Sequence, residues 1–142
     1  MTRRRIVVFG EHTPAATAAL RWAIGEAEKR DAAVVVVRPF DQRGRADLAL
    51  ERDLDRARRD ARYRTQAWVV ETVDGLDTPV TISVSTPDGS APQALVTAAQ
   101  GADLVVIGDC GAESERLAAT VRDVGGCQVR LVPRPQRIAA AH

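Results

Sequence analysis

Short runs of β-branched apolar residues alternate with amphipathic segments along the whole chain, and this alternation constrains the fold more than any other feature. The runs at 5–9 and 33–37 are continuous, as expected for strands that are covered on both faces. Shorter runs follow at 104–107 and 129–132. Between them, 80–84 alternates apolar residues with Thr and Ser, which is typical of a half-exposed edge strand. The sequence therefore predicts five strands.

Helical patterns fill the intervals between these strands. Thr13 followed by Pro14 predicts a capped helix start, and Ser90 with Gln93 has the spacing of a capping box. Four helices are expected, over about 14–30, 47–70, 91–100 and 114–124. Strands that alternate with helices predict a parallel sheet, because right-handed crossovers place helices on both of its faces. Ligands bind such sheets outside the carboxyl ends of the strands, so the loops after 5–9 and 104–107 are the expected site.

Composition excludes several classes of protein. The chain has 142 residues with 20 Lys and Arg against 19 Asp and Glu, and its net charge of +1 gives no electrostatic footprint for nucleic acid or an anionic membrane. The longest apolar run, at 32–37, is too short to span a bilayer, so we expect a cytoplasmic protein. Cys110 and Cys127 lack zinc-site spacing, and we expect them at opposite ends of the sheet, too far apart for a disulfide.

Four segments, taken in order, resemble the universal stress protein family. Residues 6–14, Ile-Val-Val-Phe-Gly-Glu-His-Thr-Pro, are similar to the family's first strand and turn, and residues 19–23, Ala-Leu-Arg-Trp-Ala, are similar to its first helix. Residues 102–108, Ala-Asp-Leu-Val-Val-Ile-Gly, followed by Gly111, resemble its fourth strand and glycine loop. Residues 127–133, Cys-Gln-Val-Arg-Leu-Val-Pro, resemble its last strand.

The resemblance implies an α/β fold. It would be one domain over residues 1–133, with an open five-stranded parallel sheet of order 3-2-1-4-5 and helices on both faces, like the adenine nucleotide alpha hydrolases. Residues 134–142 are expected to form a flexible C-terminal tail.

The pattern of the ATP-binding members is only half present. Those members resemble one another in a loop written G-x-x-G, nine residues, then Gly-Ser or Gly-Thr, whose backbone amides hold the phosphates. Gly108 and Gly111 match the first half, but no Gly-Ser or Gly-Thr pair lies between Gly111 and Cys127. Glu113 and Glu115 also place carboxylates at the helix N-terminus, where a phosphate would bind. The sequence therefore predicts a degenerate phosphate site.

Five residues are the candidate contacts for an adenine nucleotide, if one binds: Glu11, His12, Val37, Gly108 and Gly111. Glu11 stands where the family has an aspartate after the first strand, and His12 replaces a small residue. An acid beside an imidazole can coordinate a ligand or move a proton. The alternative is that Glu11 and His12 are solvated loop residues and that the two glycines only permit tight turns.

Three functions remain open at this point. The first is a universal-stress-protein-like chain that does not bind ATP, needs no cofactor, and acts by homodimerisation through its last strand or by binding an unknown protein partner. The second is a stress protein that binds ATP, ADP or AMP with an altered phosphate loop. The third is an enzyme or flavin carrier on a flavodoxin-like sheet, although the sequence has no nucleophile elbow, Walker loop or Rossmann glycine fingerprint.

Overall fold

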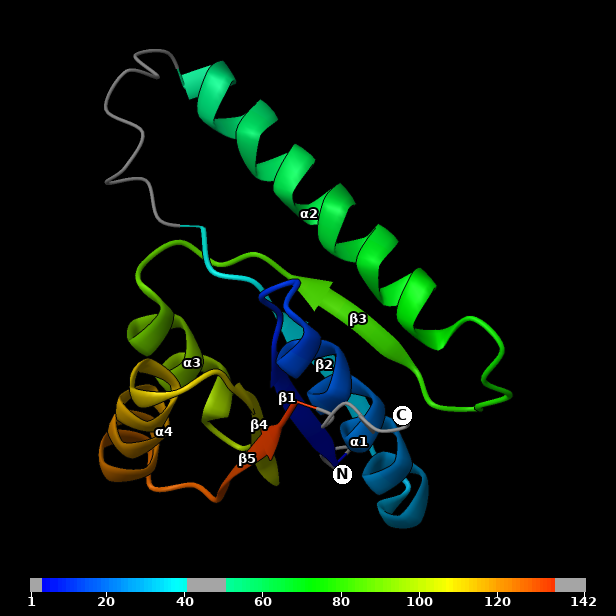
Figure 1. Cartoon of the computed structure of the whole chain (residues 1–142). Helices are drawn as coiled ribbons and strands as arrows, with labels where there is room; N and C mark the ends of the chain where they lie inside the picture. Colours follow the sequence, from blue (N-terminus) through cyan, green and yellow to red (C-terminus); the bar gives the residue numbers. More distant parts are fainter. Residues whose placement is uncertain (1–3, 41–50, 135–142) are drawn as a thin grey trace, which may run out of the picture.

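A computed structural model of the chain describes residues 4–40 and 51–134 (Figure 1). The elements are β1 (Arg5–Phe9), α1 (Pro14–Arg30), β2 (Ala33–Val37), α2 (Glu51–Val73), β3 (Ile82–Ser85), α3 (Ala91–Ala99), β4 (Leu104–Asp109), α4 (Ala112–Gly125) and β5 (Val129–Pro133). All five predicted strands and all four predicted helices are present. The expected tail, except Arg134, lies outside the described residues.

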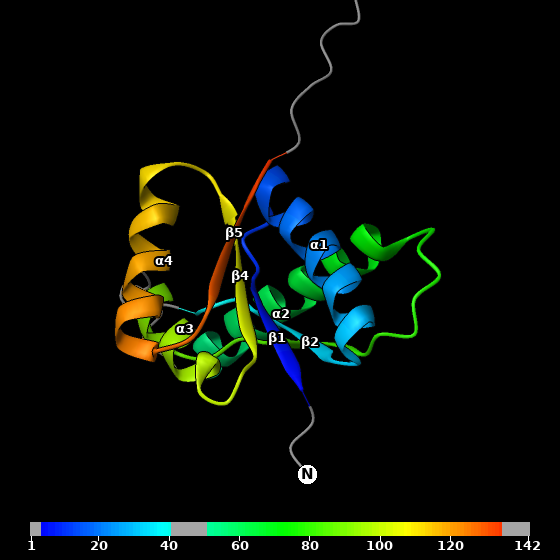
Figure 2. The ribbon, with the colours of Figure 1, turned by 90° about the horizontal axis from the view of Figure 1, so that it is seen from below.

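All five strands pair in parallel, in the order β3-β2-β1-β4-β5, which confirms the predicted sheet. Helices α1 and α2 cover one face, and α3 and α4 cover the other (Figure 2). Successive side chains of β1 point to opposite faces of the sheet. Ile6 and Val8 belong to the core under α1, and Val7 and Phe9 belong to the core under α3 and α4. The central strand is therefore buried on both sides, as its continuous apolar run predicted.

The predicted helix starts are confirmed by their caps. The Thr13 hydroxyl accepts a hydrogen bond from the Ala16 amide at 3.1 Å, and Pro14 occupies the first turn. Ser90 and Gln93 form the expected capping box. The two tryptophans also follow the expectation, since Trp22 and Trp68 pack against the core under α1.

Several element boundaries differ from the sequence prediction, and β4 and β5 end later than expected, at Asp109 and Pro133. Helix α2 continues past residue 70 to Val73, because Thr72 is buried and its hydroxyl donates to the Trp68 carbonyl one turn earlier. The expected start of this helix at 47 lies outside the described residues. Strand β3 begins at Ile82 rather than 80, and α4 begins at Ala112 rather than 114, directly after Gly111.

Cys110 and Cys127 are both free thiols. Cys110 follows β4 and Cys127 precedes β5, which is the arrangement expected from the sequence. Within the described ranges, no helix combines the length and the hydropathy that a membrane span requires.

Helix α1 lies unusually close to β4, and Gly108 makes this contact possible. A Cβ atom at position 108 would stand 2.4 Å from the Ala15 carbonyl carbon and 2.6 Å from the Ala16 nitrogen. Both of these are backbone atoms, so they cannot move aside as a flexible side chain can. Glycine at 108 therefore sets the distance between the first helix and the sheet.

Replacing Gly108 with alanine is expected to lower the free energy of unfolding by about 1–3 kcal/mol, because the added methyl group overpacks the α1–β4 contact. Gly25→Ala is the matched control in α1, where an added Cβ meets nothing within 4 Å. That variant should be more stable by about 0.5–1 kcal/mol. Urea unfolding of both variants measures the difference, and equal stabilities would contradict this role of Gly108.

Candidate functional site

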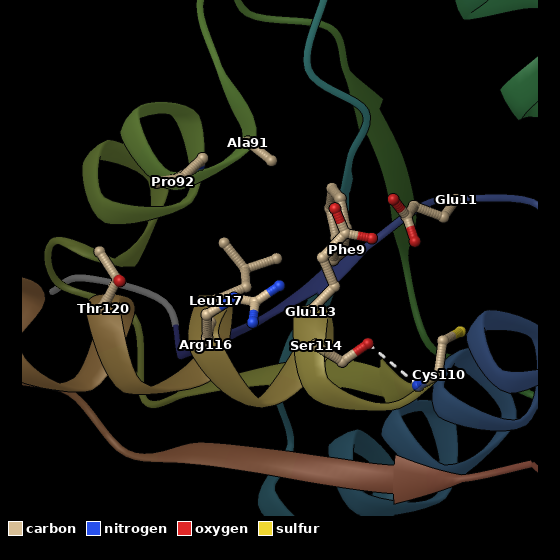
Figure 3. Close-up of a pocket in the computed structure, with 10 residues that line it drawn as sticks. All are labelled: Phe9, Glu11, Ala91, Pro92, Cys110, Glu113, Ser114, Arg116, Leu117 and Thr120. Carbon is tan, nitrogen blue, oxygen red and sulfur yellow. Dashed lines mark hydrogen bonds between the residues drawn. The ribbon is translucent and has the colours of Figure 1, made fainter.

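The carboxyl ends of the strands carry a pocket of about 340 Å³ between α3, α4 and the end of β1 (Figure 3). This is the edge at which the sequence placed the site. Its lining residues are Phe9, Glu11, Ala91, Pro92, Cys110, Glu113, Ser114, Arg116, Leu117 and Thr120. We call it the crevice pocket. Of the five candidate contacts, only Glu11 lines it.

Two carboxylates share this pocket. Glu11 comes from the loop after β1 and Glu113 from the first turn of α4, and Figure 3 shows their side chains pointing toward one another. Burial raises the pKa of the Glu11 carboxyl above its ordinary value, Arg38 partly opposes this rise, and Glu113 adds to it. The crevice pocket is therefore unfavourable for any negative charge added to those of Glu11 and Glu113.

The loop after β4 satisfies its own amides. The Cys110 amide donates to the Ser114 hydroxyl at 3.0 Å, shown as a dashed line in Figure 3, and the Gly111 amide donates to the Asp109 carboxylate at 3.0 Å. These amides lie in the glycine loop that would hold a phosphate in the ATP-binding pattern. In this chain the side chains of Ser114 and Asp109 accept the hydrogen bonds of these amides.

The two candidate glycines have different structural roles. Gly111 has φ of +119° and ψ of −150°, a conformation that is essentially restricted to glycine, and it is the N-cap residue of α4. Gly108 permits the close approach of α1 described above. Neither glycine lines the crevice pocket. The expectation of tight-turn geometry fits Gly111, whereas Gly108 serves packing between elements.

Val37 is almost completely buried, with 1% of its surface exposed, and belongs to the core under α3 and α4. Its carbonyl accepts a hydrogen bond from the Gly10 amide at 2.9 Å. This backbone group therefore joins the ends of β1 and β2.

His12 points away from Glu11. Its ring stacks on Trp68 of α2 with centroids 5.3 Å apart, and its Nε2 atom lies 3.2 Å from the Thr65 hydroxyl. The backbone of His12 has a positive φ of 52°, which turns the chain between the two side chains. Glu11 and His12 thus line different pockets, and the acid and imidazole that the sequence placed together are separated.

The pKa of His12 lies below its ordinary value. Burial of the ring is the largest cause, and the positive charges of Arg38 and Arg64 add to it. Arg38 also acts on Glu11, so one guanidinium influences both neighbouring residues of the loop after β1.

Sequence reasoning missed Arg38, Arg116 and the start of α3 as parts of this edge. Arg38 directly follows β2, and Ala91 with Pro92 begins the helix after β3, so both segments follow strands whose carboxyl ends meet here. The predicted strand order indicates that these strand ends lie at one edge of the sheet. Finding Arg116 and the start of α3 in one pocket also requires that α3 and α4 are placed side by side. Among the described residues, no group of three or more His, Cys, Asp or Glu side chains is arranged to hold a metal ion.

The sequence model of the universal stress protein family matches residues 2–119. The chain belongs to the universal stress protein family. No curated protein matches it in sequence. Solved structures of the family share its fold.

Three of these structures illustrate the likeness. A universal stress protein from Burkholderia pseudomallei is 21% identical, with 91% of this chain and 95% of that chain covered and a TM-score of 0.62. The universal stress protein from Archaeoglobus fulgidus in complex with dAMP is 21% identical over 92% and 98% of the chains, with a TM-score of 0.64. An Arabidopsis thaliana family protein with AMP bound is 12% identical over 97% of each chain, with a TM-score of 0.65.

Replacing Arg38 with glutamine tests the electrostatics of this edge. Arg38 lowers both pKa values, so its removal is expected to raise the pKa of Glu11 further and to raise that of His12 toward its ordinary value. Arg64→Gln is the matched control, because Arg64 lowers the pKa of His12 and is not among the charges that shift Glu11. NMR pH titrations of the carboxyl and imidazole carbons measure both shifts. Opposite movements of the two pKa values in Arg38→Gln would contradict the geometry.

Proposed function

We propose that this universal stress protein does not bind ATP in the manner of the family motif and acts in the stress response through dimerisation or a protein partner. The observation that carries this proposal is the occupied loop after β4. The amides of Cys110 and Gly111 already donate to side chains of the same loop and helix. A triphosphate would have to displace both acceptors, and each displaced hydrogen bond has a cost.

Charge supports the same conclusion. The first turn of α4 carries Glu113 and Glu115, whose negative charges interact favourably with the positive end of the helix dipole. Glu11 faces Glu113 across the crevice pocket. A polyphosphate entering the pocket would meet carboxylates where the ATP-binding pattern presents amides, so the residues present do not fit ATP.

A second candidate function is binding of an adenine nucleotide with fewer phosphates. Solved structures of the family include one in complex with dAMP and one with AMP bound. The crevice pocket of this chain keeps an apolar wall of Phe9 and Leu117, which suits a base, and Arg116 supplies one cation. A nucleoside or monophosphate would suffer less repulsion from Glu11 and Glu113 than ATP.

Calorimetric titration with ATP, ADP and AMP in the presence of magnesium decides between the two candidates. We expect no ATP binding in the submillimolar range, because the loop amides are occupied and the carboxylates repel phosphate. Heating the purified protein first reveals any co-purified nucleotide. Submillimolar ATP binding would contradict the leading proposal, and AMP binding alone would select the second candidate.

Charge-removing variants sharpen this titration. Glu113→Gln should tighten the binding of AMP several-fold if the second candidate is correct, because one carboxylate leaves the crevice pocket. Glu115→Gln is the matched control, since Glu115 lies in the same helical turn but does not line the pocket. Equal effects of the two substitutions would show that the pocket is not the site of binding.

The proposed dimer forms through β5. This strand lies at one edge of the sheet and leaves backbone groups unpaired on its outer side. A charged residue on an edge strand commonly blocks pairing, but the Arg130 guanidinium lies over the Trp22 ring at 5.1 Å and is directed toward α1. The outer edge of β5 therefore lacks this obstacle, which supports pairing with a second copy.

Light scattering combined with amide hydrogen exchange tests the dimer. We expect a dimer at tens of micromolar and β5 amides whose protection increases with protein concentration. Strand β3 is the internal control, because it forms the opposite edge and should show no such dependence. A monomer at this concentration, or equal behaviour of both edges, would contradict the proposed interface.

A further inference from the structure

A second pocket, of about 290 Å³, lies on the face of the sheet covered by α1 and α2. Its lining residues are His12, Arg38, Pro39, Phe40, Ala61, Arg64 and Thr65. We call it the α2 pocket. Among the described residues it shares no lining residue with the crevice pocket, and the loop after β1 separates the two.

The lining of the α2 pocket is positively charged. Two guanidinium groups, those of Arg38 and Arg64, line it, and none of its lining residues within 4–40 and 51–134 carries a carboxylate. Across 4–40 and 51–134, no hydrogen bond or ion pair engages Arg64. Arg38 uses one of its donors on the Gly10 carbonyl at 3.3 Å, and its other donors bind no residue of the described segments.

The His12 ring is held at the edge of this pocket by neighbours on α2. Thr65 donates its hydroxyl proton to the Ala61 carbonyl at 2.9 Å, so its oxygen accepts from His12 Nε2. The His12 ring also stacks on the Trp68 ring, and the Trp68 Nε1 atom donates a hydrogen bond to the Thr17 hydroxyl at 3.0 Å. Neutral His12 therefore keeps its proton on Nε2, and a proton added at Nδ1 creates a further donor and a positive charge.

We propose that the α2 pocket binds a small phosphate-class oxyanion between Arg38 and Arg64. Guanidinium forks match the geometry of phosphate oxygens, and each of the two can donate a pair of hydrogen bonds to a phosphate group. Phe40 is buried and, with Pro39, forms an apolar wall beside the charges, which limits competition by water. Thr65 is fully buried and positions His12, so the imidazole lies beside the bound anion.

Two charges near the pocket modulate this site. Protonated His12 adds to the attraction, and the low pKa of His12 reflects the positive charges of Arg38 and Arg64 as well as burial. Glu11 interacts with Arg38 from the crevice pocket and competes with the anion for that guanidinium. Anion binding is therefore coupled to proton uptake by His12 and opposed by Glu11.

Proton NMR of the histidine rings tests the proposal directly, because the chain contains only His12 and His142. A His142→Gln variant assigns the two signals. Inorganic phosphate is titrated at constant ionic strength, with sodium chloride as the balancing salt. We expect a saturable shift of the His12 signal and a rise of its pKa by on the order of one unit at saturation.

Matched variants separate specific binding from a general charge effect. Arg64→Gln should weaken phosphate binding at least about tenfold, equivalent to about 1.4 kcal/mol. Arg62→Gln removes the same charge two residues away on an exposed position that does not line the pocket, and it should leave binding unchanged. Glu11→Gln should tighten binding, because the competing carboxylate is gone.

Three results would overturn the proposal. These are the absence of a saturable His12 shift, a shift that survives both Arg64→Gln and Arg38→Gln, and an equal loss in Arg62→Gln. Circular dichroism of each variant confirms that the fold is retained. The outcome is independent of nucleotide binding, because Glu113→Gln alters the crevice pocket and should not change the phosphate titration.

Discussion

The contact between the Gly108 backbone of β4 and the Ala15 backbone of α1 is the constraint on which the rest of this structure depends. No side chain fits between them, since a Cβ at 108 would lie 2.4 Å from the Ala15 carbonyl carbon. The contact fixes the start of α1 against the sheet, and with it the direction of the loop that carries Glu11 and His12. Gly108 is also the last residue but one of β4, directly before the strand end from which the loop to α4 departs. One close approach thus positions both loops of the functional edge.

The carboxyl edge of the sheet is divided into two environments of opposite charge. On the side of α3 and α4, Glu11 and Glu113 face a loop whose amides are already satisfied. On the side of α2, Arg38 and Arg64 line a pocket in which the described lining residues include no acidic side chain. Arg38 connects the two, because its charge acts on both Glu11 and His12. One edge of a single fold can therefore carry different chemistry on its two sides.

Much of the fold could be predicted from the sequence because its signals are local. The continuous run at 5–9 indicated a strand buried on both faces, and Thr13-Pro14 and Ser90-Gln93 indicated helix starts through caps that involve only neighbouring residues. The end of α2 was placed too early, because Thr72 is held there by burial and by a bond to Trp68. Polar residues near a helix end do not show from sequence whether tertiary packing will extend the helix.

The site was less predictable because it depends on contacts between distant segments. Glu11 and His12 are adjacent in sequence, yet the positive φ of His12 and its stack on Trp68 separate them. Gly108 matches a phosphate motif, but its role follows from the proximity of α1, which no local pattern reveals. The absence of a Gly-Ser or Gly-Thr pair is visible in the sequence, whereas the hydrogen bonds from the loop amides to Asp109 and Ser114 are visible only in the structure.

The most direct test of this account is an NMR measurement of the Cys110 and Gly111 amides with and without magnesium-ATP. The account predicts amides that exchange slowly with solvent in the free protein and whose shifts do not change on adding ATP, because Ser114 and Asp109 already accept their protons. Amides that exchange freely and become protected when ATP is added would contradict it, and would show that the loop after β4 still forms a phosphate site.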